Sequence, residues 1–335
     1  MDIYRVEDGM EVESNSIYLI PPRKNMTIFR NKLFLSEQDI HKGLNLPIDI
    51  FLRSLAKEKH KNAIAIILSG TGSDGTLGTR AVKEAGGMVM VQDDRSAKFD
   101  GMPRSSISTG LVDYILPPGK MPQELVKYVE HPYINKTQKI EKIISKDEDI
   151  LTKIIMIIRD TIGVDFSYYK KNTVIRRLEK RMSINQVNKI EDYVAFLSRS
   201  SHEVNILYKE LLIGVTRFFR DIEAFELIRQ KVIPNLFKNR KASSPIRVWC
   251  VGSSTGEEAY SLAILIKEYM DANDLNMDVK IFATDIDKES VEIAGTGIYA
   301  ESIVSDIPPD LLSKYFNKVE EGYQIISKIR KMVIF

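Results

Sequence analysis

The stretch VWCVGSSTGEEAYSLAI, residues 248–264, joins a short apolar run to a helical pattern through a loop of small residues. This order is typical of a parallel β-strand that turns tightly at Gly252 and leads into a helix. Such a turn gathers backbone N–H groups at a helix N-terminus, and glycine lets a ligand approach the backbone closely. The stretch therefore predicts an α/β domain with a ligand-binding loop.

Two kinds of chemistry fit this loop. The spacing Gly252-x-Ser254-x-Gly256 formally matches the nucleophile elbow of serine hydrolases. All 4 histidines precede Ser254, whereas the α/β-hydrolase order is serine, acid, histidine. Other hydrolases use other orders, but His202 lies in a polar stretch, SRSSHE, that offers no catalytic arrangement. The hydrolase interpretation is therefore disfavoured.

The cofactor interpretation accounts for more of the neighbourhood. Adjacent Glu257 and Glu258 disfavour a polyphosphate and favour a ligand with a cationic ammonium group. The next apolar run, VKIFATD, ends in Asp285, whose carboxylate can accept both ribose hydroxyls of an adenosine. An adenosine that carries a cationic amino acid is S-adenosylmethionine. The alternative role, complementing the helix dipole, is favoured for Glu257 alone; for Glu258 together with Asp285 we favour cofactor binding.

The bulk composition narrows the class of protein. Of 335 residues, 44% are hydrophobic and 28% are charged, which is ordinary for a soluble globular chain. A net charge of +2 gives no general reason to expect nucleic acid or membrane partners. The longest apolar run, residues 63–68, is too short to span a bilayer. One cysteine, Cys250, excludes internal disulfides and favours a cytoplasmic protein, and no metal site is expected.

The pattern of elements changes three times along the chain. The runs NAIAIILSG and MVMVQ, with a helix from about Thr76 between them, predict a βαβ unit. A charged, glycine-free segment follows, then a region with helical spacing throughout, then the second α/β region. We therefore expect an α/β domain, a linker, an all-α subdomain and an α/β subdomain, at residues 1–129, 130–148, 149–242 and 243–335.

The second half of the chain resembles a known family. The stretch at 248–264, followed by IFATDIDKESVEIAGTGIY and preceded by LLIGVTRFFRD, is similar to the CheR chemotaxis receptor methyltransferases. The resemblance implies a Rossmann-like domain that transfers a methyl group from S-adenosylmethionine to glutamate side chains of a chemoreceptor-like protein. This sequence departs from the family pattern at Gly214, where asparagine is common, and at Ala259, where proline is common.

Site residues follow from this resemblance by position. Thr216 and Arg220 would border the cofactor, Glu258 would bind its amino group, and Asp285 its ribose. Arg220 is expected either to meet the carboxylate of the cofactor or to position the carboxylate of the substrate.

A basic helix lies in the all-α region. The stretch KKNTVIRRLEKRM places four cations, Arg176, Arg177, Lys180 and Arg181, on one face. Most such runs are solvated surfaces, and nucleic acid is disfavoured because no aromatic residues are interleaved. The resemblance implies that these four residues dock an acidic receptor helix that carries the target glutamates.

The first block resembles the catalytic domain of the CheB methylesterases. The segments that carry this resemblance are VEDGMEVESNSIYLIPP, residues 62–94 and FDGMPRSSISTGLVDYILP. They imply a partial doubly wound domain in which Asp74 matches the aspartate of a Ser-His-Asp triad; without the resemblance, Asp74 is an ordinary turn residue. The family's serine and histidine belong further N-terminal, and neither His41 nor His60 matches. We therefore expect a fusion truncated at both ends, with an inactive esterase half.

Two hypotheses follow. The leading one is an S-adenosylmethionine-dependent protein-glutamate O-methyltransferase. The alternative is a non-catalytic regulatory or docking module of chemosensory signalling.

Overall fold

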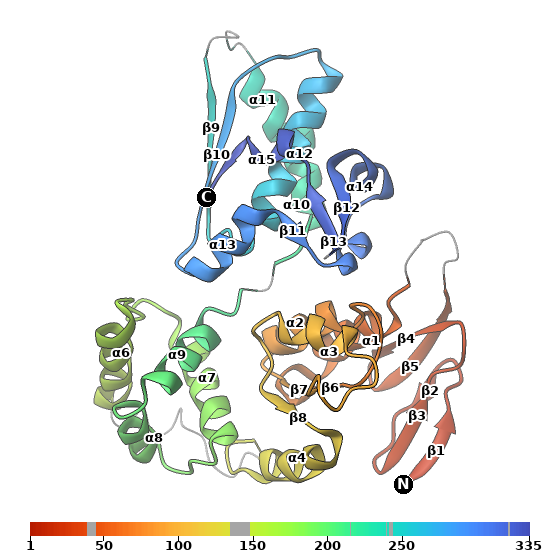
Figure 1. The fold of residues 1–335 in the computed structure, drawn as a ribbon, viewed down its shortest axis with the longest axis vertical. Coiled ribbons are helices and arrows are strands. Elements are labelled where there is room, and N and C mark those ends of the chain that lie inside the picture. The colour runs from red at the N-terminus through yellow and green to blue at the C-terminus, as the bar shows by residue number, and fades with distance from the viewer. Residues whose placement is uncertain (39–44, 135–147, 215, 239, 241–243, 321) are drawn as a thin grey trace. The chain divides into compact units, whose positions relative to one another are not determined.

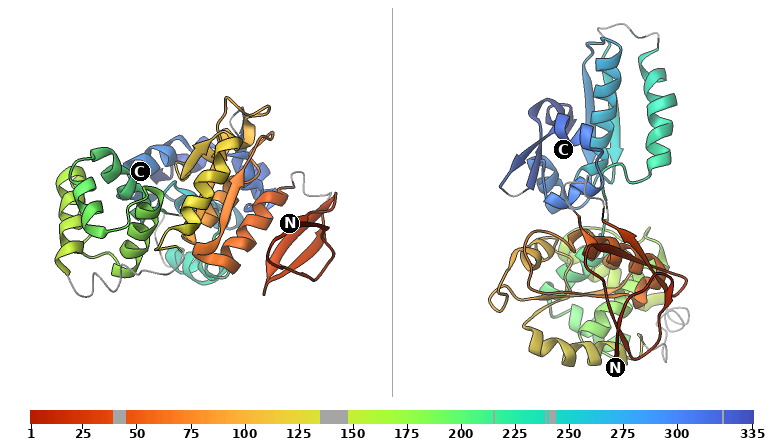
Figure 2. Two further views of the ribbon diagram at one scale, coloured as in Figure 1. Left: turned by 90° about the horizontal axis from the view of Figure 1, so that it is seen from below. Right: turned by 90° about the vertical axis from the view of Figure 1, so that its right-hand side faces the viewer.

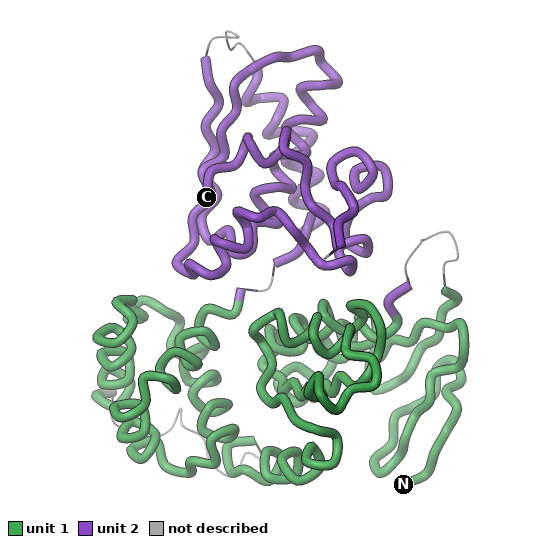
Figure 3. Tube along the Cα trace, viewed as in Figure 1, with its two compact units in different colours: residues 1–39, 47–213 green, residues 40–46, 214–335 purple. Residues whose placement is uncertain are grey.

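The computed structural model describes residues 1–38, 45–134, 148–214, 216–238, 240, 244–320 and 322–335. The chain forms two compact units (Figure 3). The first holds residues 1–39 and 47–213, and the second holds residues 40–46 and 214–335. Most of the expected linker, residues 135–147, lies outside the described residues. Residues 214–238, which we assigned to the helical subdomain, belong to the second unit. Within the described residues, no helix is long and apolar enough to cross a membrane.

The first unit begins with two small sheets (Figure 1). One is parallel and the other antiparallel, and α1 packs against β4 through Phe51 and Leu55. The elements are β1 (Asp2–Arg5) paired with β3 (Ser16–Leu19), the sheet of β2 (Met10–Glu11), β5 (Lys32–Glu37) and β4 (Lys24–Phe29), and α1 (Pro47–Lys59).

A parallel sheet of three strands confirms the predicted βαβ unit. Alternate residues of β7 point to opposite faces: Val89 and Val91 pack with α1 and α2, while Met88 and Met90 pack with α4. The elements are η1 (His60–Asn62), β6 (Ile64–Ile67), α2 (Thr76–Glu84), β7 (Met88–Gln92), α3 (Gly101–Ile107), β8 (Tyr114–Leu116), η2 (Pro118–Lys120) and α4 (Met121–Glu130). β7 is buried throughout, but Ile66 of β6 is 40% exposed.

Helices complete the first unit, as the helical spacing predicts. Ile154, Ile158, Leu178, Tyr193 and Leu207 are fully buried in a shared apolar core. The helices are α6 (Glu148–Ile162), α7 (Lys171–Ile184), α8 (Ile190–Leu197) and α9 (Ser201–Leu211).

The second unit is built on a parallel sheet in the order β14-β10-β9. α12 covers one face, where Ala263 and Ile264 pack with Ile281 (Figures 1 and 2). The elements are α10 (Ile222–Leu227), the π-helix η3 (Ile228–Val232), α11 (Ile233–Phe237), β9 (Ile246–Val251), α12 (Glu257–Ala272), β10 (Val279–Thr284), α13 (Lys288–Thr296), η4 (Glu301–Ser305), α14 (Pro309–Tyr315), α15 (Ser327–Arg330), β14 (Val333–Ile334) and the antiparallel β11 (Ile298–Tyr299), β13 (Gly322–Ile325) and β12 (Phe316–Val319).

Candidate functional site

The loop between β9 and α12 turns through left-handed backbone conformations. Gly252, Ser254 and Gly256 have φ of 72°, 46° and 93°. A Cβ atom on Gly256 would lie 2.9 Å from the Cβ of Ala294 and 2.9 Å from the ring of Phe335. Only glycine fits this position without strain, and α12 starts at the next residue. The loop therefore has the tight turn that the sequence predicts.

Asp285 follows β10 and lies beside this loop. Its Oδ2 accepts the N–H of Ser254 at 2.7 Å, and its Oδ1 accepts the N–H of Asp287 at 2.9 Å. A carboxylate oxygen can accept two hydrogen bonds, so both oxygens keep capacity for the hydroxyl groups of a ligand. The side chain is partly exposed. These features fit a carboxylate that binds a ribose diol.

The two glutamates that begin α12 differ in their surroundings. Glu257 is buried and accepts the hydroxyl of Thr255 at 2.6 Å, so it stabilises the loop. Glu258 is exposed, and its Oε1 accepts the thiol of Cys250 at 3.4 Å. Burial, followed by the charges of Glu258 and Asp285, raises the pKa of Cys250 to about 12. Both carboxylates thus act on one thiol at the end of β9.

The segment before α10 is tied to this loop at one point and to α12 at another. The hydroxyl of Ser254 donates to the carbonyl of Gly214 at 3.5 Å, and the N–H of Phe219 donates to the hydroxyl of Ser261 at 3.1 Å. Phe218, between these points, is buried in the apolar core. Thr216 is half-buried and Arg220 is exposed. The structure therefore brings the segment that holds Thr216 and Arg220 to the first turn of α12.

The residues of this site fit a cationic nucleoside cofactor in their chemistry. Two carboxylates, Glu258 and Asp285, are available to a ligand ammonium and a ligand diol. The hydroxyl of Ser253, in the same loop, is buried and has no hydrogen-bond partner among the described residues. No group of three or more histidine, cysteine or acidic side chains within the described residues could hold a metal ion.

The expected basic face of α7 is not a solvated surface. Arg176 is exposed, but Arg177, Lys180 and Arg181 are buried. Arg181 forms two hydrogen bonds with the carboxylate of Glu203, at 2.9 and 2.7 Å. The prediction of one exposed basic face is therefore wrong for these three residues. The physical reason is that they pair with buried carboxylates, which the local sequence pattern does not reveal.

Asp74 lies in the turn before α2. Its two oxygens accept the N–H groups of Ile48 and Asp49, at 3.1 and 2.9 Å, so it caps α1. Among the described residues, no histidine bonds to Asp74; His60 is exposed in η1, and His41 lies outside the described residues. Asp49 itself was missed by sequence reasoning, although an aspartate within the apolar pattern PIDIF was a signal. It is buried, and burial raises its pKa to about 7.

Comparison with protein families gives three adjoining matches. The CheB methylesterase family matches residues 1–125, the all-alpha domain of the CheR methyltransferases matches residues 149–212, and their SAM-binding domain matches residues 214–335.

Individual relatives match the whole chain or a part of it. A 104.1 kDa protein of Rhodobacter capsulatus, from the hypE 3' region, is 37% identical over all of this chain, which covers 37% of that relative. A chemotaxis protein methyltransferase of Borreliella burgdorferi is 33% identical over 57% of this chain and 69% of its own length. The crystal structure of the Thermotoga maritima CheB methylesterase catalytic domain is 34% identical, covering 37% of this chain and 67% of that one, with a TM-score of 0.34. This chain thus spans about a third of the length of the Rhodobacter relative.

Proposed function

The chain is a CheB methylesterase domain followed by the all-α and SAM-binding domains of a CheR methyltransferase, and on this premise we propose that it methylates glutamate side chains of a chemoreceptor-like protein. The methyl donor is S-adenosylmethionine, the cofactor of the SAM-binding domain. The protein acts in the cytoplasm on an acidic segment of the receptor, without nucleic acid.

One observation carries this proposal. Glu258 begins α12 and Asp285 follows β10, and the two carboxylates flank one loop of left-handed residues: Glu258 accepts the thiol of Cys250, and Asp285 accepts the N–H of Ser254. An ammonium group and a ribose diol are the two features of S-adenosylmethionine that such carboxylates bind. We assign the ammonium to Glu258 and the diol to Asp285.

The reaction asks little of acid–base groups. S-adenosylmethionine supplies a methyl group that its sulfonium already activates, and a glutamate side chain is ionised at neutral pH. The chain must hold the two reactants in line and exclude water from the attacking carboxylate. Arg220 and Thr216 border the cofactor in this proposal, and Arg220 positions one of the two carboxylates, that of the cofactor or that of the substrate.

We propose that the methylesterase-type domain, as present in this chain, does not hydrolyse methyl esters. Both oxygens of Asp74 accept N–H groups of α1, which supports a capping role. A triad aspartate orients its histidine by accepting the Nδ1–H of the ring.

Calorimetric titration with S-adenosylhomocysteine tests the cofactor site. We expect binding that Glu258→Gln and Asp285→Asn each weaken by at least tenfold. Glu292→Gln and Asp278→Asn, exposed carboxylates of the same unit, are the matched controls. Equal affinity in the site and control variants would overturn the assignment.

Methyl transfer is measured separately. Transfer of a labelled methyl group to a glutamate-bearing receptor fragment, in a form released by mild base, identifies a carboxyl methyl ester. Cofactor binding without any such transfer to receptor fragments would instead favour a docking module.

A further inference from the structure

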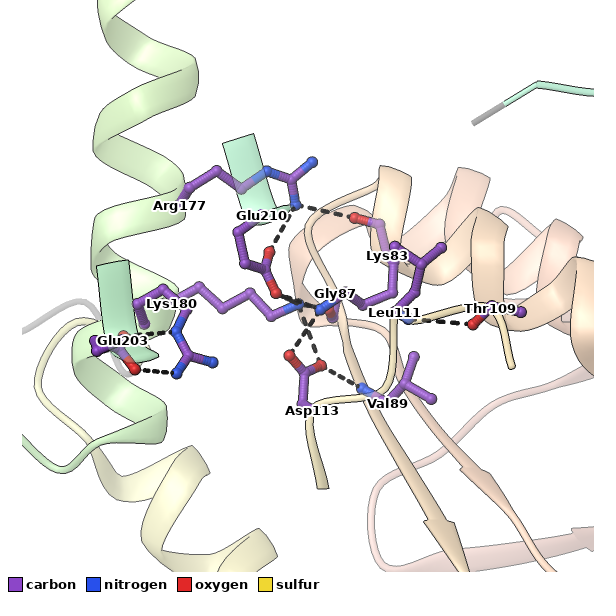
Figure 4. Close-up of polar contacts among 11 residues, drawn as sticks. Lys83, Gly87, Val89, Thr109, Leu111, Asp113, Arg177, Lys180, Glu203 and Glu210 are labelled. Carbon is purple, nitrogen blue, oxygen red and sulfur yellow. Dashed lines mark hydrogen bonds and ion pairs between the residues drawn. The ribbon is translucent and has the colours of Figure 1, made fainter. Parts of the chain in front are cut away.

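A second group of charged side chains lies inside the first unit. Figure 4 shows it between the methylesterase-type domain and helices α7 and α9. We call it the buried charge cluster; its side chains are at most 6% exposed. Its members are Lys83, Asp113, Arg177, Lys180 and Glu210.

Each cation of the cluster bonds across the boundary between the two domains. The Nζ of Lys83 lies 2.7 Å from Asp113 of its own domain and 2.5 Å from Glu210 of α9. The Nζ of Lys180 donates to the carbonyl of Gly87 at 2.6 Å and lies 3.2 Å from Asp113.

Arg177 and Asp113 complete the cluster. Arg177 donates to the carbonyl of Lys83 at 3.0 Å and lies 3.7 Å from Glu210 (Figure 4). Asp113 is held on its own side by the N–H of Val89, at 2.9 Å. Family matches assign Lys83, Asp113 and Val89 to the methylesterase domain, and α7 and α9 to the all-alpha domain.

Neutral contacts continue this boundary. The hydroxyl of Tyr114 donates to the carbonyl of Ile184 at 3.4 Å, and Ile184 packs against the apolar cluster that includes Met88 and Met90. The hydroxyl of Ser183 lies 3.0 Å from Nδ1 of His131. Beside the charges there is thus a packed apolar surface, which resembles a domain core more than a transient contact.

Removing five charged groups from water is costly unless each is paired, and exposing one partner alone leaves an uncompensated buried charge. We propose that the faces of α7 and α9 that carry the cluster are a permanent docking surface for the methylesterase-type domain of the same chain. That domain is then a structural partner of the methyltransferase half, and Arg177 and Lys180 are not available to an acidic receptor segment. This inference does not depend on the proposed function.

The charges of the cluster give the proposal a specific signature. When Lys180 is protonated, below about pH 7, three cations face two carboxylates and the cluster carries a net charge of +1. Asp113→Asn raises this charge to +2, and adding Lys180→Met to it restores +1. The double variant should therefore recover part of the loss that the single variant causes.

The test uses the full chain with a protease site introduced within residues 135–147. After cleavage, we expect the two parts of the unmodified chain to co-elute in size-exclusion chromatography at micromolar concentration. They should do so in 1 M salt as well, because desolvated ion pairs are screened little. Asp113→Asn and Glu210→Gln should each weaken the association by at least about thirty-fold. Asp160→Asn and Glu13→Gln, at exposed sites, should leave it unchanged.

Separation of the unmodified parts at low salt would overturn the proposal, whether or not the variants fold. The proposal would also be overturned if the cleaved parts of the Asp113→Asn protein associated as tightly as those of the Asp160→Asn control. Circular dichroism of each separated part distinguishes loss of docking from loss of folding.

Discussion

The carboxylate of Asp74 accepts the backbone N–H of Asp49 at 2.9 Å, and the carboxylate of Asp49 in turn accepts the N–H of Gly78 at 2.7 Å. Each aspartate thus caps the first turn of a helix, Asp74 that of α1 and Asp49 that of α2. Oδ2 of Asp49 is buried without a hydrogen-bond partner among the described residues. Burial, with a smaller contribution from the charge of Asp74, raises the pKa of Asp49 to about 7.

This arrangement predicts a pH dependence in the methylesterase-type domain. The pKa of Asp49 is about 7 in the folded chain and 3.8 in the unfolded chain. Between pH 3.8 and pH 7 the folded state therefore binds a proton at Asp49 that the unfolded state has released. The contribution of Asp49 to stability is therefore largest below pH 4, falls as the pH rises toward 7, and is constant above that. Asp49→Asn should flatten this fall and raise stability at pH 8 by about 1–4 kcal/mol.

Hydrogen exchange of amides within residues 47–92 measures this local stability at pH 5 and pH 8. Asp160→Asn, at an exposed site, is the control and should keep the fall. An Asp49→Asn protein whose stability falls as steeply as the unmodified protein would contradict the assignment.

The buried charge cluster predicts an opposite pH dependence for domain docking. Burial, only partly offset by Asp113 and Glu210, lowers the pKa of Lys180 to about 7. Docking then releases a proton from Lys180, so association of the cleaved parts should tighten as the pH rises above 7. Four groups near Lys180 keep their charge state in this range. Burial lowers the pKa of Lys83, but the charges of Asp113 and Glu210 outweigh it and hold that pKa above its ordinary value of 10.5. Burial raises the pKa of Glu210, but the charges of Lys180 and Lys83 outweigh it and hold that pKa below 4.5. Arg177 stays charged and Tyr128 stays neutral.

Sedimentation of the cleaved chain at pH 7 and pH 9 tests this. We expect the dissociation constant of the unmodified parts to fall at least tenfold, and that of Lys180→Met to change little. If the dissociation constant changed equally with pH in the unmodified protein and in Lys180→Met, the proton released on docking would come from a group other than Lys180.

The sequence predicted the strands and helices that carry the cofactor loop, because their signals are local. Apolar runs, glycines at the turns and an aspartate after β10 are all visible within a few residues of one another. The burial of the basic residues of α7 could not be predicted from such local signals. The spacing of Arg177 and Lys180 describes a helix face. Their partners across the domain boundary lie in a distant part of the sequence: Lys180 pairs with Asp113, in the stretch LVDYIL, and Arg177 donates to the carbonyl of Lys83. Pairing of distant charges is a property of the packed structure.

Cys250 is expected to orient Glu258. Its thiol donates to Oε1 of Glu258, and its raised pKa keeps it protonated as a donor. Since one hydrogen bond contributes roughly 1 kcal/mol, Cys250→Ala should weaken binding of S-adenosylhomocysteine by about fivefold. Cys250→Ser retains a donor and should restore most of the affinity. Calorimetry on the three proteins checks this, and a Cys250→Ser protein no better than Cys250→Ala would show that only packing matters.

Gly256 is expected to be intolerant of any side chain. Its φ of 93° is unfavourable for L-residues, and a Cβ would meet Ala294 and Phe335 at 2.9 Å. A left-handed alanine alone costs roughly 1–2 kcal/mol, so Gly256→Ala should destabilise the second unit by at least this amount and weaken S-adenosylhomocysteine binding.

Gly295→Ala is the matched control: it lies within α13, its φ is not left-handed, and nothing lies within 4 Å of a Cβ built at this position. That change should be neutral or stabilise the helix by up to about 1 kcal/mol. Hydrogen exchange of the amides of α12 as a function of urea measures unfolding of this unit. Equal unfolding midpoints for the two variants would mean that the loop is not strained at Gly256.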